Sequence, residues 1–387
     1  MVTAGDARLR LESVSRCASV YARLDLLPSG LDGETYSHGT TNVEAGPQFR
    51  LALAQVRRRD PLRLAVGADA VTASTLTGSV IERKVPLPER WLRAFTEAQV
   101  ITATFDLRAE LASSQAMTFL QSLPRGRRRD VAWAIPHGRI LRLADMPAPG
   151  AICLPSPNRL GVLAASWRPG TVLQAYGPAV TAASAPTAST WVLASPATRL
   201  SLTLSPDANR GLSGEGAALT ALAGPTAMDD ADLIAAVLAW EPVPDVTALA
   251  AASGLAPARV RDALTVLATS GQIGYDVAEA AYFHRSLPFD AARVERANPR
   301  LAAARAIIDQ GGVRLHADGA SVTSGPSTYH LRPEGTRLRC TCQWWAENGG
   351  QRGPCKHELA VRIHQRSAEP LGRPVPPAGE PSRGSPA

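Results

Sequence analysis

The spacing of apolar and polar positions divides the chain into segments of different character. Over residues 1–220, short apolar stretches alternate with turns rich in Gly, Pro, Asp and Ser, as strands with tight connections do. The clearest of these expected strands are 62–66, 102–105, 161–165 and 200–204. Two other segments, 88–100 and 106–123, repeat apolar residues with helical spacing, and Asp106 is placed to cap the second. The balance predicts an α+β region that is strand-dominated toward 150–205.

The pattern changes after a run of small residues at 211–224, which we predict to be a linker. Three short helices are expected next, followed by two extended segments that can pair as a hairpin: 229–240, 246–253, 257–269, 272–275 and 281–284. Helix, helix, turn, helix and β-wing is the order of a winged helix-turn-helix. The pattern therefore predicts a winged-helix-like domain over residues 226–288.

The remainder of the chain predicts a smaller module and a tail. Residues 290–310 favour a connecting helix, and 313–339 favour strands with a turn at Gly325–Pro326. The last segment, 367–387, is rich in Pro, Gly and Ser, and we expect it to be disordered because it has almost nothing to bury. The expected fold class is thus α+β and multidomain, with a strand-rich part at 1–220, the winged-helix-like middle and a small module at 312–366.

Composition narrows the class of protein. Hydrophobic residues make up 45% of the 387 positions and charged residues 19%, so most of the chain should fold. No apolar run approaches the roughly 20 residues that span a bilayer, and no signal peptide is evident, so we expect a cytoplasmic protein with no membrane partner. Only Lys84 and Lys356 among the 41 basic residues are lysines, a bias typical of GC-rich bacterial genomes. The net charge of +7 therefore does not by itself indicate a nucleic-acid partner.

The strongest chemical signal is a cluster of cysteines. Three of the five lie within sixteen residues, as a C-T-C motif, twelve further residues and a C-K-H motif. Structural zinc takes four tetrahedral ligands, and three cysteines with one histidine form a closed set of this kind. Alternation along a strand places the first two cysteines on one face, and the glycine-rich loop 343–354 can fold back to complete the site. The spacing predicts one structural Zn²⁺ per chain, held by Cys340, Cys342, Cys355 and His357.

The sequence offers little support for catalysis. Four protein ligands leave a zinc ion no open position for water. Neither a phosphate-binding loop, a dinucleotide fingerprint, an HExxH motif nor a carboxylate pair is present. Ser37 beside His38 does not suggest a nucleophile and its base, because neighbours on an extended chain point to opposite faces. We therefore predict no catalytic residue and a protein that is not an enzyme. An enzyme of unrecognised type in residues 1–220 is the weaker alternative.

The cysteine pattern also resembles a known family. A C-x-C…C-x-H arrangement after a β-hairpin, with Tyr329 upstream and C-K-H-E-L-A-V at 355–361, resembles a SWIM zinc finger over 312–366. The resemblance implies a small ββα zinc module that binds DNA or protein without catalysis. Segments 34–43 and 85–91 are similar to parts of long bacterial SWIM proteins, which are often encoded beside a MoxR-type AAA+ ATPase and a von Willebrand A protein. This second resemblance implies that the partner is a MoxR-type AAA+ ATPase or a von Willebrand A protein.

Candidate binding residues lie in two further places. Arg259 and Arg261 are near the start of the third helix of the expected winged helix, where such folds place base-reading residues, but the wing is acidic. Trp344 and Trp345 flank the expected zinc loop and either pack beneath it or form an exposed partner surface.

Arginine runs at 57–59 and 125–129 are expected to be solvated faces, with phosphate contact as the alternative. Two functions from different classes follow for the whole chain. The first is a non-enzymatic zinc-binding adaptor for a protein partner. The alternative is a DNA-binding protein that uses the SWIM module and the winged helix together, whose affinity should depend strongly on salt.

Overall fold

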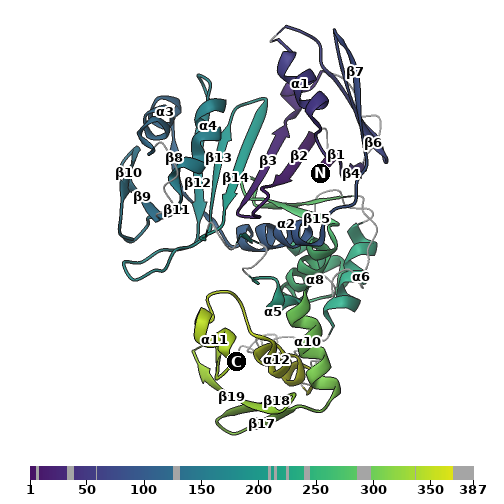
Figure 1. The fold of residues 1–387 in the computed structure, drawn as a ribbon, viewed down its shortest axis with the longest axis vertical. Helices are drawn as coiled ribbons and strands as arrows, with labels where there is room; N and C mark the ends of the chain where they lie inside the picture. The colour runs from purple at the N-terminus through teal and green to yellow at the C-terminus, as the bar shows by residue number, and fades with distance from the viewer. Residues whose placement is uncertain are drawn as a thin grey trace, which may run out of the picture.

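The computed structural model describes most of the chain: residues 1–5, 8–32, 39–57, 59–124, 131–207, 211–212, 216–223, 226–238, 245–285, 298–335 and 337–368. The protein is α+β with several antiparallel sheets, as predicted. The sheets of the N-terminal part lie at one end, a group of helices in the middle and a small sheet at the other end (Figure 1). None of the described helices is both long enough and apolar enough to cross a membrane.

An eight-stranded antiparallel sheet dominates the N-terminal part, in the order β4-β1-β2-β3-β14-β13-β12-β8. Its strands are β1 (Val2–Gly5), β2 (Arg8–Val14), β3 (Val20–Leu26), β4 (Gly39–Thr41), β8 (Asp106–Leu111), β12 (Val172–Gly177), β13 (Ser189–Ala194) and β14 (Thr198–Leu204). Strand β3 pairs with β14, with Leu26 opposite Thr198 and Val20 opposite Leu204. The sheet therefore joins the start of the chain to residues near 200.

Helices and smaller sheets cover this large sheet. The covering elements are α2 (Glu89–Thr102), α3 (Ser113–Ser122), η2 (Pro157–Leu160), α4 (Gly161–Ser166) and a sheet of β9 (Val131–His137), β10 (Ile140–Ala144) and β11 (Ile152–Pro155). Trp191 of β13 is fully buried and stacks on Phe119 of α3, with ring centroids 5.6 Å apart. A further sheet extends from the first strands with its own helix: η1 (Pro28–Gly30), α1 (Pro47–Gln55), β5 (Arg63–Val66), β6 (Ala70–Thr75) and β7 (Gly78–Arg83).

Several sequence predictions for this part were wrong. Segment 106–123 is not one helix, because its first six residues form β8 and pair with β12, where Leu111 faces Leu173. Helical preference over six residues is weak, and ladder hydrogen bonds with cross-strand packing outweigh it. Segment 161–165 is helical in α4, and 102–105 forms the end of α2 and a turn rather than a strand.

The predicted linker at 211–224 is also corrected. Its described residues include α5 (Leu219–Leu222), and Leu212, Ala218 and Leu219 are buried. Small residues there allow close packing against α8 (Pro257–Ser270), which an exposed linker would not make. This segment is therefore part of the core.

The middle of the chain has the predicted order of three helices and a hairpin. These elements are α6 (Ala227–Leu238), α7 (Val246–Ser253), α8, β15 (Ile273–Asp276) and β16 (Ala281–His284). The side chain of Asp245 caps α7 by accepting from the Thr247 amide at 3.0 Å. Gly254 and Gly271 end α7 and α8 with φ of 71° and 88°, a backbone conformation that glycine adopts without strain.

The C-terminal part is larger than the ββα unit that the family resemblance implied. It has a four-stranded sheet and three helices: α10 (Pro299–Asp309), β17 (Val313–His316), β18 (Gly319–Ser324), β19 (Ser327–Glu334), β20 (Arg337–Cys340), α11 (Gln343–Asn348) and α12 (Lys356–Ala368). The outer strands β17 and β20 contribute Val313 and Leu338 to the same apolar core as the central strands β18 and β19. Part of the expected connecting helix (290–297) and most of the expected tail (369–387) lie outside the described residues.

One apolar core continues from α5 through the middle helices into the C-terminal sheet. Its buried members include Leu222, Ile234, Leu267, Leu301 and Leu359. Helices α10 and α12 pack against each other and against the inner face of the sheet. The helical middle and the C-terminal module therefore support each other.

The β15–β16 hairpin, the expected wing, packs on the eight-stranded sheet. Asp276 of the hairpin lies 2.8 Å from Arg23 and 3.2 Å from Arg199, and all three side chains are buried. Glu279 in the hairpin turn pairs with Arg199 at 2.8 Å and with Arg8 at 2.5 Å. The acidic residues of this hairpin thus neutralise arginines of β2, β3 and β14.

A second buried pair lies beside the first contact. Arg285, which follows β16, meets Glu12 of β2 at 2.5 Å, and both side chains are almost fully buried. Phe283 packs between arginines, with the guanidinium carbon of Arg10 at 4.3 Å and that of Arg285 at 4.9 Å from its ring centroid. This interface fixes the hairpin on the sheet.

Candidate metal centre

Three different local structures position the four predicted ligands. Cys340 is the last residue of β20 and lies opposite Leu331 of β19. The strand ends there, so Cys342 is not its continuation, as the alternation argument expected, but the N-cap residue of α11. Cys355 immediately precedes α12, and His357 lies in the first turn of that helix. Segment 343–354 brings the chain back to Cys355, but it is not a loop throughout, because its first six residues form α11.

The four side chains meet in one buried cluster. Their ligand atoms all lie within 4.8 Å of one another, and each residue is at most 5% exposed. Sγ of Cys340 lies 3.7 Å from Nδ1 of His357. Zn–S bonds of about 2.3 Å and Zn–N bonds of about 2.0 Å would place these atoms about 3.5 Å apart in a tetrahedron. The predicted ligands are thus brought together and can hold one metal ion.

The protonation of the three thiols fits the same interpretation. Hydrogen bonds from Cys340 and Cys355 lower the pKa of Cys342 far below its ordinary value. The shared hydrogen bond with Cys342 raises the pKa of Cys340 to about 11, and hydrogen bonds with Cys340 and Cys342 raise the pKa of Cys355. The three thiols are therefore close enough to share protons, and a divalent cation bound among them would favour the thiolate form of each.

Tyr329 of β19 supports the histidine ligand. Its ring stacks on that of His357, with centroids 4.0 Å apart and planes 21° apart. Nε2 of His357 is buried and has no hydrogen-bond partner among the described residues, whereas Nδ1 faces the sulfur of Cys340. In most metal sites a hydrogen bond to the second ring nitrogen orients the histidine ligand. Here the stacked ring of Tyr329 orients the imidazole instead. In the sequence, only the family resemblance pointed to Tyr329.

The two tryptophans lie in α11 and are half-buried, and each makes contacts within the module. Nε1 of Trp345 donates to the carbonyl of Leu338 at 3.0 Å. The guanidinium of Arg300 lies 4.3 Å from the ring centroid of Trp344. Both rings are partly buried against the shared core. Both tryptophans therefore take part in the packing of the module, and their role as a partner surface stays a prediction.

Arg300 of α10 is a residue that sequence reasoning missed. Its guanidinium donates to the carbonyls of Arg352 at 2.9 Å and Pro354 at 3.0 Å, so it braces the loop that precedes Cys355. Burial lowers the pKa of Arg300 to about 10, although Glu97 opposes the shift. Arg300 is separated from these two residues by 52 and 54 positions in the chain, so no local sequence pattern predicts the contact.

The candidate nucleic-acid residues of the middle domain have different surroundings. Arg259 forms a two-pronged pair with Asp230 of α6, at 2.9 Å and 2.6 Å. That bond occupies the guanidinium edge that would read a base. Arg261 is exposed, as are Arg57 and Arg59. The run 125–129 and the Ser37–His38 pair lie outside the described residues.

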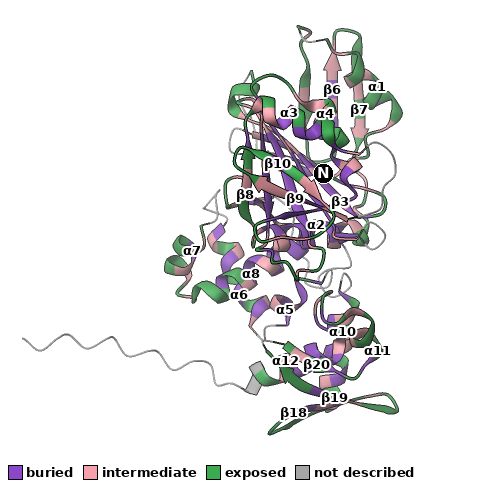
Figure 2. Cartoon of the chain, turned by 90° about the vertical axis from the view of Figure 1, so that its left-hand side faces the viewer, coloured by how far each residue is buried: buried purple, intermediate pink, exposed green. Residues whose placement is uncertain are grey.

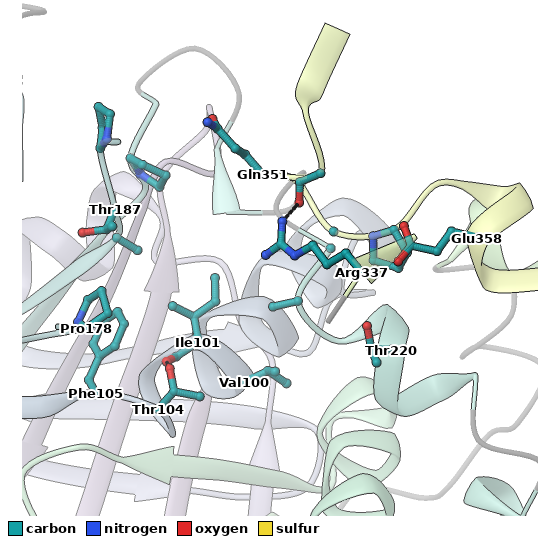
Figure 3. A pocket seen from close by; sticks show the side chains of 18 of the residues that line it. Val100, Ile101, Thr104, Phe105, Pro178, Thr187, Thr220, Arg337, Gln351 and Glu358 are labelled. Atoms are coloured by element: carbon teal, nitrogen blue, oxygen red, sulfur yellow. Dashed lines mark hydrogen bonds between the residues drawn. The ribbon is translucent and has the colours of Figure 1, made fainter. Parts of the chain in front are cut away.

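A cavity of about 530 Å³ lies where the metal module meets the N-terminal part (Figure 3). Val100, Ile101 and Phe105 form an apolar wall, while Arg337 and Glu358 face it from the metal module. Arg337 donates to the carbonyl of Gly350 at 2.5 Å.

Comparisons with known proteins do not assign a family. No protein-family model matches the chain, and no curated protein matches it. Similar solved structures include a chain of "C-terminal region of FEN-1 bound to A. fulgidus PCNA", at 11% identity and a TM-score of 0.34, covering 53% of this chain and 87% of that one. PCNA of Entamoeba histolytica has 11% identity, a TM-score of 0.33 and coverages of 53% and 87%. PCNA of Thermococcus kodakaraensis has 9% identity and a TM-score of 0.34, and the match covers 53% of this chain and 88% of that one. Similarity this low carries no conclusion about function.

Proposed function

We propose that the protein is a non-enzymatic interaction scaffold whose C-terminal part is a SWIM-type zinc finger. The observation that carries the proposal is the closed set of four buried ligands, Cys340, Cys342, Cys355 and His357. Zinc bound by four protein ligands has no open position for water, so its role is to stabilise the module rather than to catalyse. The ion supplies folding free energy to a small region in which one strand end, one short helix and the start of α12 meet.

The partner surface is proposed to lie in the N-terminal part. The two segments that resemble long bacterial SWIM proteins lie side by side in their described residues. The Val85 amide donates to the Asn42 carbonyl at 2.9 Å, and Nδ2 of Asn42 donates back to the Val85 carbonyl at 2.9 Å. Their contact supports a single surface for one protein, which we propose to be a MoxR-type AAA+ ATPase or a von Willebrand A protein.

The alternative is a DNA-binding protein that reads bases with a winged helix in the middle domain. The order α6, α7, α8, β15, β16 supports a winged-helix assignment. Reading by Arg259 competes with its pair to Asp230, and the wing is engaged by arginines of the large sheet. We therefore rank this alternative second.

Affinity capture from the native host tests the scaffold proposal. The tagged full chain is compared with Asn42→Ala, which removes the side-chain bond to the Val85 carbonyl, and with Asn348→Ala as a control on the metal loop. The proposal expects the purified ATPase or von Willebrand A protein to bind the wild type and the control, and to bind Asn42→Ala less. Equal capture by all three, or direct binding of neither purified protein, would contradict the assigned surface.

A further inference from the structure

The cavity beside the metal module has no role in the functions proposed above. Its volume of about 530 Å³ is within the range of small-molecule sites. Residues of α2 and α5 line it on one side, and residues of β20, α12 and the segment 350–354 that leads into Cys355 line it on the other. In Figure 2, β20 and α12 lie below α2 and α5. An occupant would therefore contact the metal module and the N-terminal part at once.

One side of the cavity is apolar. It is lined by Val100 and Ile101 near the end of α2, by Phe105 after the following turn, and by Pro178 and Pro186 between β12 and β13. The first three residues are only half-buried, so they keep apolar surface that the protein itself does not cover. Replacing water with the apolar body of a ligand at such a surface is favourable. This wall has aliphatic and proline side chains with a single aromatic ring, which suits an aliphatic chain.

The opposite side of the cavity carries a positive charge. Arg337 of β20 reaches toward the cavity from the metal module, across from Val100 and Ile101 (Figure 3). Its Nη1 donates to the carbonyl of Gly350, which leaves the other N–H donors of the guanidinium for a ligand. Within the part of the chain that the structure describes, no carboxylate forms an ion pair with Arg337, although Glu334 lies opposite it in the strand register. The charge of Arg337 is therefore available to an anion.

Glu358 is the acidic residue of the lining, and its charge is already balanced. Its Oε1 accepts from Nη2 of Arg362 at 2.8 Å and from Nε of the same side chain at 3.1 Å, within α12. Arg362 also lines the cavity, so the charged lining residues are two arginines and one glutamate. The lining therefore has one net positive charge, which matches a ligand with one negative charge.

We propose that the cavity binds a small aliphatic carboxylate, such as a medium-chain fatty acid. Its carboxylate pairs with the guanidinium of Arg337, and its chain lies along the apolar wall. Hydrogen bonds between a guanidinium and a carboxylate are charge-assisted, so they fix the orientation of the ligand as well as holding it. This inference goes beyond the scaffold proposal, because the cavity shares no residue with the contact between Asn42 and Val85.

The test is isothermal titration calorimetry of the full chain with hexanoate, octanoate and decanoate, each kept below the concentration at which it forms micelles. Each should bind at one site per chain. The affinity should rise about two- to fourfold for each added methylene, where the upper figure corresponds to complete burial. Octanol has the same apolar body as octanoate without the charge, and it should bind about tenfold more weakly, since a hydrogen bond to a charged group is lost.

Three variants locate the ligand. Arg337→Gln should lower the affinity for octanoate to that for octanol and leave octanol binding unchanged. Arg314→Gln is the matched control, because it removes an exposed arginine of the same small sheet that does not line the cavity, and it should bind both probes like the wild type. Thr104→Trp fills the cavity from an exposed position beside α2 and should abolish binding of both probes. Zinc content and the circular dichroism spectrum confirm that each variant is folded.

Four results would overturn the inference. Equal affinity of the wild type for octanoate and octanol would show that the site does not recognise an anion. Equal losses in Arg337→Gln and Arg314→Gln would show attraction by net charge alone. Full binding by Thr104→Trp would place the ligand outside the cavity. Absence of octanoate binding by a folded chain that contains zinc would exclude the carboxylate site and leave the scaffold proposal standing.

Discussion

Asp276, in the hairpin of the middle domain, lies 2.8 Å from Arg23 in the third strand of the large sheet, and both side chains are buried. The two residues are separated by more than 250 positions in the chain. Burying a charge pair is favourable only when each member is well paired, and here Arg199 completes the site at 3.2 Å from Asp276. This contact explains why the expected wing is acidic. Its carboxylates are used within the molecule.

Replacing Asp276 by Asn should destabilise the protein by about 3–5 kcal/mol, because it leaves buried arginines without their partner. Denaturant unfolding of the full chain measures this. Asp25→Asn is the comparison within the same cluster and should cost less, because burial raises the pKa of Asp25 despite Arg23. A cost for Asp276→Asn no larger than that for Asp25→Asn would contradict this account of the interface.

Stability should fall in acid because of the same interface. Burial raises the pKa of Asp276, but Arg23 and Arg199 outweigh it, and Arg285 does the same for Glu12, so both folded pKa values lie below the unfolded ones. A depressed pKa gives stability that is present above the unfolded value of about 4 and is lost as pH falls through the folded value. Thermal melts between about pH 7 and 3 should show the loss in the wild type below about pH 4. Asp276→Asn should show a smaller loss, and an equal loss would exclude Asp276 as a source.

Much of the fold was predictable where local patterns decide it. Gly254 and Gly271 mark the ends of two helices correctly, since a left-handed residue after a helix is a local requirement. The strand at 106–111 was not predictable from its own six residues, because its partner β12 lies more than sixty residues away. Leu219 likewise lies in a run of small residues that predicts a linker, and only its tertiary packing with α8 shows that it belongs to the core.

The metal ligands were predictable because their chemistry is rare in this chain. Three cysteines and a histidine at close spacing have few other uses in a protein with five cysteines. The stacking of Tyr329 and the brace from Arg300 depend on tertiary contacts. Sequence spacing carries no record of them.

Tyr329 should control how tightly the metal is held. Tyr329→Phe preserves the ring over His357 and should retain the affinity of the wild type for zinc. Tyr329→Ala removes the support that orients the imidazole and should weaken zinc binding about 10–100-fold, as loss of a ligand's supporting group commonly does. Competition with a chromophoric chelator measures both. Equal affinities for the two variants would show that the stacked ring has no role.

Arg259 should matter for stability but not for nucleic acid. Its side chain is 44% exposed, so Arg259→Gln should cost no more than about 1 kcal/mol through loss of the Asp230 pair. Any binding of duplex DNA by the full chain, measured by fluorescence anisotropy, should be the same for Arg259→Gln, Arg261→Gln and the wild type. A selective loss for Arg259→Gln would restore the winged-helix reading of DNA.

The metal content of the purified full chain tests the central claim most directly. Elemental analysis of protein prepared without added metal or chelator should find one equivalent of zinc per chain. Cys342→Ser removes one of the four ligands and should abolish it, with the C-terminal module unfolding and the melting transition of the N-terminal part retained. Less than half an equivalent in the wild type, or zinc retained in full by Cys342→Ser, would contradict the account.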